Sequence, residues 1–574
     1  MALPKPDFDS DNERPLSRIA RARMFIADMR PSDRLIFYVL VAGVGIALLQ
    51  TVYALERRYL IEVPSYGGSL VGGVIGAPRF VNPLLAISDA DKDLTVLTYA
   101  GLMGYDEFGE LAPVLAERVD ISPDGKVYTF TLRPGTKFSD GTPLTSEDVV
   151  YTIEKAQDPS LKSPEFQNWS HISVQALDVM TVQFTLAKPY TPFLQDATLG
   201  ILPSSLWKNV SDEEFPFSPY MLRPVGAGPF AVESITQNDT GGVTAYALKA
   251  NSNYPLGRPY LDTFHFLFFE DLSGLREALD SGKIEAAYGT IGAYTISSPY
   301  SRIFGVFFNS LAEPLFARDE VRKALSLAID RDAIVRDILG GYGTASMGPV
   351  PAGFGIDEVA LPLSANRLTD ARKVLTTGGW AFSTSTNTWT KKDKKETITL
   401  SLTLKTGNVP ELKAIANAIQ KNWGELGVPT TIELYSGTEL TQTVIRPRKY
   451  GALLFGEVIG ASPDLFAFWS STERSDPGLN ISNYNNKTVD VLLSKIRTQV
   501  NGSEEQMETL TEINQRISAD YPAAFTHTPD FVYTVPNDVQ GIVLSHISSP
   551  SDRFHTVAHW YRRTEFVWPI FIKK

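Results

Sequence analysis

The chain opens with one long apolar stretch and then changes to short alternating segments. Leu35 to Leu55 carries no formal charge, and a helix of this length spans about 30 Å, the thickness of the hydrocarbon core of a bilayer. We therefore predict a transmembrane helix at 35–55, between a tail at 1–34 and a linker at 56–65. A cleaved signal peptide is the alternative, but the long segment before the apolar stretch favours an uncleaved anchor.

Arginines around this stretch predict its orientation. They are concentrated before it, whereas only Arg57 and Arg58 follow it closely. The positive-inside rule then places the N-terminus in the cytoplasm and everything after the linker outside the cell. We expect a single-pass protein of the cell membrane. Arg18 to Met29 is predicted either as a short amphipathic helix on the inner leaflet or as a solvated tail.

After the linker, the pattern indicates strands, turns and helices in alternation. Apolar and polar residues alternate over 128–132, the period of a half-buried strand. Turn residues at 134–141 would bracket a second short strand around Phe138. Thr145, with Asp148 three residues later, predicts a capped helix start.

Further elements follow from the same periodicities. Strands are expected at 71–75, 307–309, 398–404 and 430–435, and helices at 89–99, 321–335, 368–380 and 410–426. A helical turn is expected at 111–117, a helix followed by a strand at 272–288, and an exposed hairpin at 383–396. The series indicates an α/β protein.

The segment at 124–150, DGKVYTFTLRPGTKFSDGTPLTSEDVV, closely resembles the extracytoplasmic solute-binding proteins of family 5, the oligopeptide-, dipeptide- and nickel-binding receptors of ABC importers. The resemblance begins near residue 66. It continues in the same order through the segments RFVNPL at 79–84, GAGPF at 226–230 and VRKALSLAIDRDAIV at 321–335.

This resemblance implies a periplasmic-binding-protein-like type II fold with an extra inserted lobe, preceded by the transmembrane helix. The solute-binding domain would cover 66–574, with lobe I at 66–103, 224–304 and 530–574, lobe II at 104–223, and lobe III at 305–529. It implies a monomer that captures a peptide-like solute outside the cell and delivers it to an ABC permease in the membrane. The alternatives are a receptor for a sugar, a metal chelate or haem, and a sensor or chaperone without a transport role.

Composition and charge narrow the classes of function. With 43% hydrophobic and 21% charged residues the chain is typical of a folded protein, and its net charge of -12 argues against a nucleic-acid partner. There are no cysteines, which excludes disulfides, thiolate catalysis and a lipid-modified cysteine anchor. Any membrane anchor must therefore be made of protein.

No catalytic motif stands out. The sequence lacks Gly-x-Ser-x-Gly, His-Glu-x-x-His and a Walker-type loop, so we expect no enzyme activity. His555 and His559 are the sole histidine pair at helical spacing, and no third ligand is near them in sequence. We expect neither a metal site nor a cofactor.

Candidate binding residues come from the resemblance, at Lys449 to Trp469. Peptide binders of the family often carry an acid for the peptide ammonium in a segment resembling Gly-Trp-x-Ala-Asp-Tyr-x-Asp-Pro. Aligned on Ser462-Pro463-Asp464, Ala461 takes the position of that acid and Glu457 that of the tryptophan. Either Glu457 or Asp464 supplies the partner for the ammonium, or the ligand has no free amine.

The other candidates have structural interpretations beside the functional one. Asp464 can be the N-cap of a helix starting near Leu465, and Phe466 and Trp469 can line a pocket or fill a core. Side-chain amides and a guanidinium that could meet ligand or hinge backbone complete the candidates: Asn82, Asn309 and Arg446.

Overall fold

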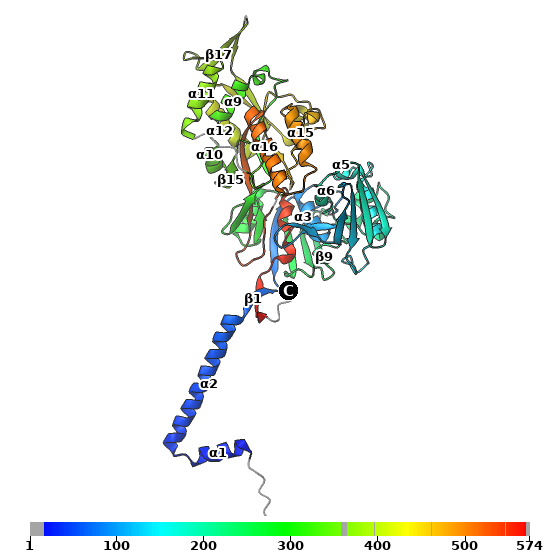
Figure 1. Ribbon diagram of the computed structural model, residues 1–574, viewed down its shortest axis with the longest axis vertical. Helices are drawn as coiled ribbons and strands as arrows, with labels where there is room; N and C mark the ends of the chain where they lie inside the picture. The colour runs from blue at the N-terminus through cyan, green and yellow to red at the C-terminus, as the bar shows by residue number, and fades with distance from the viewer. Residues whose placement is uncertain (1–16, 357–363, 395, 461, 546, 570–574) are drawn as a thin grey trace, which may run out of the picture. The chain divides into compact units, whose positions relative to one another are not determined.

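The computed structural model describes residues 17–356, 364–394, 396–460, 462–545 and 547–569 (Figure 1). Ala461, which takes the place of the family's acid, lies outside these residues. The chain divides into two compact units. One contains the residues up to Ser65 together with those from Thr564 onward, and the other extends from Tyr66 to Arg563.

The first unit contains the apolar helix. It is composed of α1 (Arg18–Asp28), α2 (Pro31–Tyr59) and a two-stranded pairing of β1 (Ile61–Ser65) with β23 (Arg563–Val567). The predicted apolar stretch lies within α2, and Pro31–Tyr53 is the one helix of the described residues that is long and apolar enough to cross a membrane. Arg34 donates hydrogen bonds to the carbonyl oxygens of Ile26 at 3.1 Å and Ala27 at 2.7 Å, and so caps the end of α1.

The second unit is built on a twelve-stranded sheet. Its order is β20 (Thr430–Tyr435), β19 (Leu402–Gly407), β21 (Ala452–Val458), β14 (Arg302–Phe308), β22 (Ala523–Thr534), β12 (Ala286–Tyr288), β2 (Ser69–Ile75), β11 (Thr263–Phe269), β10 (Val243–Ala250) and β9 (Phe230–Gln237). Two further strands, β13 (Thr295–Pro299) and β15 (Gly343–Ala345), pair with β22. Because β22 pairs with β14 near its start and with β12 near its end, it joins the two halves of the sheet.

One half of this sheet contains a parallel α/β arrangement. Strand β19 pairs in parallel with β20 and with β21, and α12 (Pro410–Leu426) connects β19 to β20. Leu453 and Leu454 are neighbours on β21 but belong to cores on opposite faces, since successive strand side chains point to opposite sides. The face of Leu454 is covered by α9 (Asp319–Ala328), α11 (Arg367–Thr377) and α12, and that of Leu453 by α15 (Lys487–Ile496) and α16 (Glu504–Asp520).

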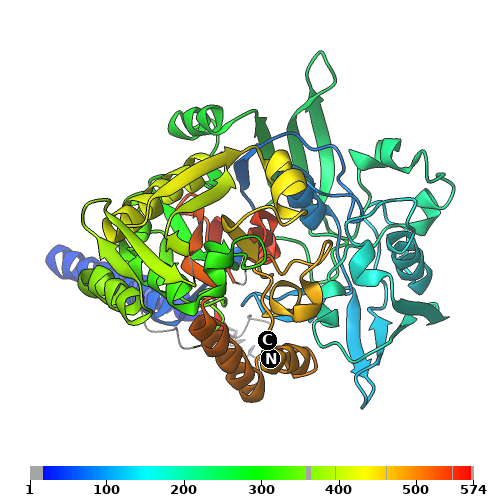
Figure 2. The same cartoon turned by 90° about the horizontal axis from the view of Figure 1, so that it is seen from above.

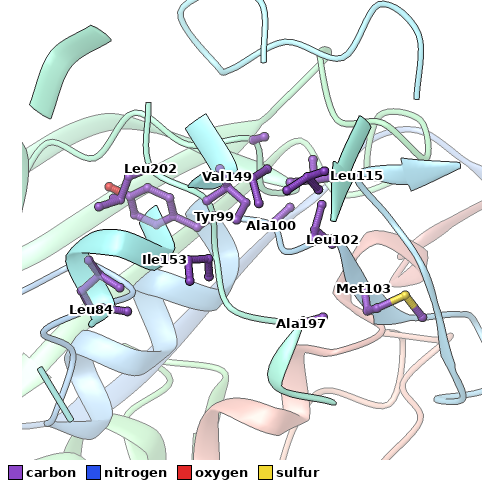
Figure 3. Close-up of a cluster of buried hydrophobic side chains, with 14 of the residues drawn as sticks. Leu84, Tyr99, Ala100, Leu102, Met103, Leu115, Val149, Ile153, Ala197 and Leu202 are labelled. Carbon is purple, nitrogen blue, oxygen red and sulfur yellow. The ribbon is translucent and has the colours of Figure 1, made fainter. Parts of the chain in front are cut away.

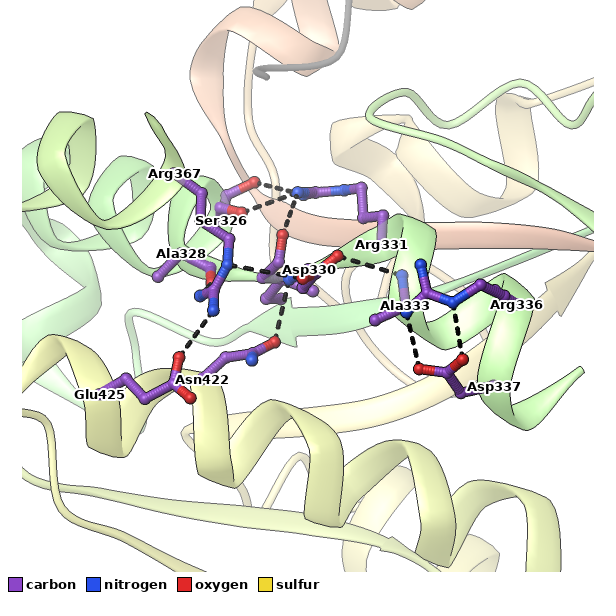
Figure 4. A network of polar contacts seen from close by, with 11 residues as sticks. Ser326, Ala328, Asp330, Arg331, Ala333, Arg336, Asp337, Arg367, Asn422 and Glu425 are labelled. Carbon is purple, nitrogen blue, oxygen red and sulfur yellow. Dashed lines mark hydrogen bonds and ion pairs between the residues drawn. The ribbon is translucent and has the colours of Figure 1, made fainter. Parts of the chain in front are cut away.

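A polar network fixes the helices on one of these faces (Figure 4). Arg331, 4% exposed at the start of α10 (Arg331–Ala333), donates to the carbonyl oxygens of Ser326 at 2.9 Å and Phe525 at 2.8 Å. The backbone N–H of Asp330 donates to Asn422 Oδ1 at 2.9 Å. The predicted helical segment 321–335 is thereby tied to α12 and to β22.

A separate four-stranded antiparallel sheet lies to one side of the large sheet (Figures 1 and 2). Its strands, in order, are β5 (Ala116–Ile121), β6 (Val127–Leu132), β8 (Thr181–Leu186) and β7 (Ile172–Asp178). They pack on α4 (Ser146–Ala156) around Val149, Ile153 and neighbouring apolar side chains (Figure 3). The predicted helix start is confirmed, since Asp148 Oδ2 accepts a hydrogen bond from the backbone N–H of Thr145 at 2.8 Å.

The remaining strands form two small sheets, β3 (Met103–Tyr105) with β4 (Leu111–Pro113) and β16 (Ala381–Ser383) with β17 (Thr388–Asp393) and β18 (Glu396–Thr399), and several further helices accompany them. The helices are α3 (Asp89–Thr98), α5 (Phe166–Trp169), α6 (Phe193–Asp196), α7 (Ser204–Trp207), α8 (Leu272–Asp280), α13 (Gly437–Glu439) and α14 (Phe466–Trp469).

Three predicted elements were wrong. The helical turn at 111–117 is instead β4 and the start of β5, because pairing of β4 with β3 overrides the local apolar spacing. No strand forms around Phe138, where the two turns leave room only for a single bridge between Lys137 and Pro143. The single strand expected at 398–404 is divided between β18 and β19, which pair in different sheets. The division into three lobes remains a prediction.

Candidate binding site

Three parallel strands of the large sheet end at one edge. Strands β19, β20 and β21 end at Gly407, Tyr435 and Val458. In open α/β sheets, ligands bind beyond the carboxyl ends of the parallel strands. Glu457 is the last residue but one of β21, and Asp464 follows in the loop that leaves this strand. The sheet therefore places these two predicted site residues at the edge where a ligand is expected.

Glu457 is a buried acid without a partner. In the register of β14 and β21 it lies opposite Ile303, a residue of the apolar core beneath α15 and α16. Its side chain is 3% exposed, and neither carboxylate oxygen has a hydrogen-bond partner among the described residues. Burial raises the pKa of Glu457 well above the usual value of a glutamate. Since an unpaired buried carboxylate is costly, burial favours the neutral form of this acid.

Trp469 fills the core on the same face. It is 1% exposed, and its ring lies 6.2 Å from that of Phe307 and 5.6 Å from that of Phe525, centroid to centroid. Its indole Nε1 has no hydrogen-bond partner among the described residues. Trp469 therefore packs as a core aromatic while keeping an unused donor.

Asp464 and Phe466 meet an arginine that sequence reasoning missed. The Nε atom of Arg497 lies 3.1 Å from Asp464 Oδ2, and the guanidinium lies 4.8 Å from the centre of the Phe466 ring. The same guanidinium lies 5.0 Å from the Tyr190 ring, and the backbone N–H of Thr191 donates to the carbonyl oxygen of Arg497 at 3.2 Å. We call these five residues the Arg497 junction.

The Arg497 junction connects two different cores. Tyr190 packs against the core of the four-stranded sheet, whereas Phe466 packs against the core beneath α15 and α16. The Arg497 guanidinium makes a cation–π contact with each ring and an ion pair with Asp464, and these interactions reinforce one another. The Arg497 junction joins the two sheets beside the carboxyl edge of β21.

Two more acids lie near the Arg497 junction. Burial, together with the charges of Glu165 and Asp464, raises the pKa of Asp196 to about 7. Burial likewise raises the pKa of Glu165, while its hydrogen bond from Asn168 and the charge of Lys92 act in the opposite direction. Asp196 therefore changes charge near neutral pH.

Asp464 is not the N-cap that the sequence predicted as its alternative role, because the N-cap of α14 is Leu465, but its carboxylate still contacts the start of this helix. Its Oδ1 accepts a hydrogen bond from the backbone N–H of Phe466 at 3.0 Å, at the start of α14. One carboxylate oxygen thus organises the helix start, and the other meets Arg497.

The remaining candidates have local structural partners. Asn82 is 0% exposed and accepts a hydrogen bond from the backbone N–H of Leu84 at 2.9 Å, and Asn309 donates to the carbonyl oxygen of Arg448 at 3.1 Å. Arg446 is exposed, and its Nε lies 3.9 Å from Asp476. Each of the three residues therefore contacts a neighbouring loop.

No metal centre is seen in the part of the chain that the structure describes. No three His, Asp or Glu side chains there come together as ligands. His555 instead stacks on Tyr105, with ring centroids 3.8 Å apart.

Comparison with known proteins identifies the fold. The family model described as bacterial extracellular solute-binding proteins, family 5, matches residues 110–478. The chain is 26% identical over 495 residues to the oligopeptide-binding protein AppA of Bacillus subtilis, covering 83% of this chain and 89% of that protein.

Solved structures agree. The substrate-binding protein CtaP of Listeria monocytogenes superposes with a TM-score of 0.71 at 24% identity, covering 87% of this chain and 99% of CtaP. NikZ of Campylobacter jejuni, solved in complex with Ni(L-His), gives a TM-score of 0.65 at 24% identity, covering 86% of this chain and 99% of NikZ. At this identity the two structures support the fold alone.

Proposed function

Because this chain belongs to the bacterial extracellular solute-binding proteins of family 5, we propose that it is a membrane-anchored receptor that captures a peptide-like solute outside the cell and delivers it to an ABC permease. Members of the family are substrate-binding proteins of transporters and not enzymes. The observation that carries the peptide-like ligand is the position of Glu457, a buried acid with no partner at the carboxyl edge of β21.

The proposed ligand site consists of the acid and the residues of the following loop. Glu457 would meet a positively charged group of the ligand. Asp464 and Phe466, already ordered by Arg497, would border it, and Trp469 would offer its indole N–H. The proposed role of the three other candidates is to hold loops in place: Asn82, Asn309 and Arg446.

The proposed anchor is α2. A receptor held at the membrane meets its permease at a high effective concentration without any additional contact. The apolar span at Pro31–Tyr53 and the arginines before it support a single-pass topology with the binding domain outside.

A metal chelate is the second candidate ligand, because NikZ holds Ni(L-His) on the same fold. Such a ligand would meet Glu457 without a free ammonium group, because its amine is bound to the metal. The two candidates therefore differ in whether binding needs a free amine.

Native mass spectrometry of the full chain, released gently from detergent micelles, tests the proposal. We expect co-purified masses that fragment as peptides. If peptide mixtures produce no thermal shift while a nickel chelate, a sugar or haem does, the peptide proposal must be given up.

A further inference from the structure

We infer that Glu457 exchanges a proton for a positively charged group of the ligand. Its carboxyl group is neutral in the empty receptor and releases its proton to solvent when the cationic group arrives. The inference rests on the proposed function and adds to it the charge of the ligand and a dependence of affinity on pH.

The position of Glu457 is what makes this exchange possible. It lies near the carboxyl end of β21, past the residues that pair in parallel with β19 and opposite Ile303 of the antiparallel strand β14. Ligands of α/β proteins bind beyond such strand ends. Next to it, the backbone N–H of Ile459 donates to the carbonyl oxygen of Ser301 at 2.9 Å, in the crossover from β13 to β14. Glu457 thus lies where the chain passes between the two halves of the large sheet.

The two arginines on the neighbouring elements are engaged elsewhere. On β14, Arg302 is adjacent to its register partner Ile303, but successive side chains point to opposite faces, and Arg302 donates to the hydroxyl of Tyr300 at 2.6 Å. Arg497, at the end of α15, is occupied by Asp464.

Two further polar groups on these elements have partners of their own. Lys495 of α15 pairs with Glu505 of α16 at 3.0 Å. The hydroxyl of Tyr450 donates to the carbonyl oxygen of Ile481 at 2.7 Å. Among the described residues, no ion pair to Glu457 is present.

The proton balance is simple. The empty site is a neutral carboxylic acid, and the ligand brings one positive charge. In the complex a carboxylate faces the cation, so the pair is neutral and one proton has passed to the buffer. An ion pair satisfies the buried oxygens that are otherwise without partners.

A pH dependence of known sign follows. Burial holds the pKa of Glu457 high in the empty receptor, and an adjacent cation lowers it in the complex. Below the pKa of the empty site, binding releases one proton, so affinity should rise about tenfold for each unit of pH. Above that pKa the affinity should become constant.

The experiment compares two probes on the full chain. A library of random tripeptides with free amines and the same library after N-acetylation are tested by thermal shift at pH 5.5, 6.5 and 7.5. For the tightest free-amine peptide, titration calorimetry in buffers of different ionisation enthalpy then counts the protons released.

We expect the free-amine library to bind with about one proton released, and the acetylated library to bind at least a hundredfold more weakly. Glu457→Gln, which has the shape of the neutral acid, should remove both the proton release and the pH dependence. Glu433→Gln is the matched control. That acid lies near the same edge on β20 but is paired with Lys405 at 3.3 Å, so its replacement should leave the proton count unchanged.

Two results would overturn the inference in distinguishable ways. Equal binding of both libraries, with no proton release, removes the proton exchange and leaves the peptide receptor intact. Failure of both libraries to bind, with a shift by the nickel–histidine chelate, removes the peptide function and the proton exchange with it.

Discussion

Two buried acids of this receptor differ in the partners that the fold gives them. Asp93 and Arg553 are 1% and 2% exposed in their side chains, and Arg553 Nη1 donates to Asp93 Oδ1 at 2.8 Å. Glu457 is similarly buried, and its carboxylate has no hydrogen-bond partner in the part of the chain that the structure describes. The acid of a structural ion pair and the acid proposed to face the ligand can therefore be told apart by whether their oxygens have partners, although the sequence shows only two acidic residues.

Asp93→Asn should destabilise the protein. Removing one member of a buried pair leaves the charge of Arg553 uncompensated, which costs about 3–5 kcal/mol. Urea denaturation of the second unit, followed by its intrinsic fluorescence, should show the free energy of unfolding falling by that amount. Asp120→Asn is the control, because its pair with Arg118 is exposed and should change stability by less than about 1 kcal/mol. An equal loss in both variants would contradict the argument.

The elements differ in how far their sequence predicts them. Helix α12 and strand β20 have the predicted bounds, since each carries its own start and stop signals, such as Pro410 at the first helical position and Gly427 at the C-cap with φ +96. β4 and β5 depend on pairing with strands elsewhere in the chain, and local periodicity gave the wrong result.

The candidate site, like the strands, could be predicted from the sequence only where local motifs mark it. Glu457 and Asp464 were found because they replace or flank a family motif. Tyr190 and Asp196 could not be found in this way. Tyr190 reaches Arg497, and Asp196 reaches Asp464, only through tertiary packing of segments far apart in sequence. A single sequence carries no signal for such a contact.

The Arg497 junction should weaken as pH rises through about 7. Because the pKa of Asp196 is raised in the folded state, Asp196 holds its proton more tightly when the junction is packed than when the junction is unfolded. The protonated side chain therefore stabilises the packed junction at low pH, and this stabilisation is lost when Asp196 ionises. Amide exchange at 190–197, corrected for the intrinsic rate, should be faster at pH 8 than at pH 6.

Two variants check this element. In Asp196→Asn the difference between pH 6 and pH 8 should disappear, and Arg497→Ala should speed exchange at both values by tenfold or more. If Asp196→Asn keeps the full pH difference, another group is responsible for it.

For the whole molecule, the absence of cysteine makes topology directly measurable. We expect Ser475→Cys to react with a membrane-impermeant maleimide in intact cells, and Ala27→Cys to react only after the cells are lysed. Both positions are exposed in their own units. Labelling of Ala27→Cys in intact cells would contradict the proposed orientation, and loss of the segment before residue 55 from the mature protein would contradict the retained anchor.

The single strand β22 has a mechanical consequence for any movement of the receptor. It is hydrogen-bonded to β14 and β15 over one part of its length and to β12 and β13 over the other. Rotation of one half of the sheet against the other must then be absorbed as added twist of a hydrogen-bonded ribbon, and not by a free pivot. The resistance of β22 to twisting would then work like a torsion spring. Its stiffness would set how much of the ligand-binding energy is stored as twist when the two halves close and is released when they open.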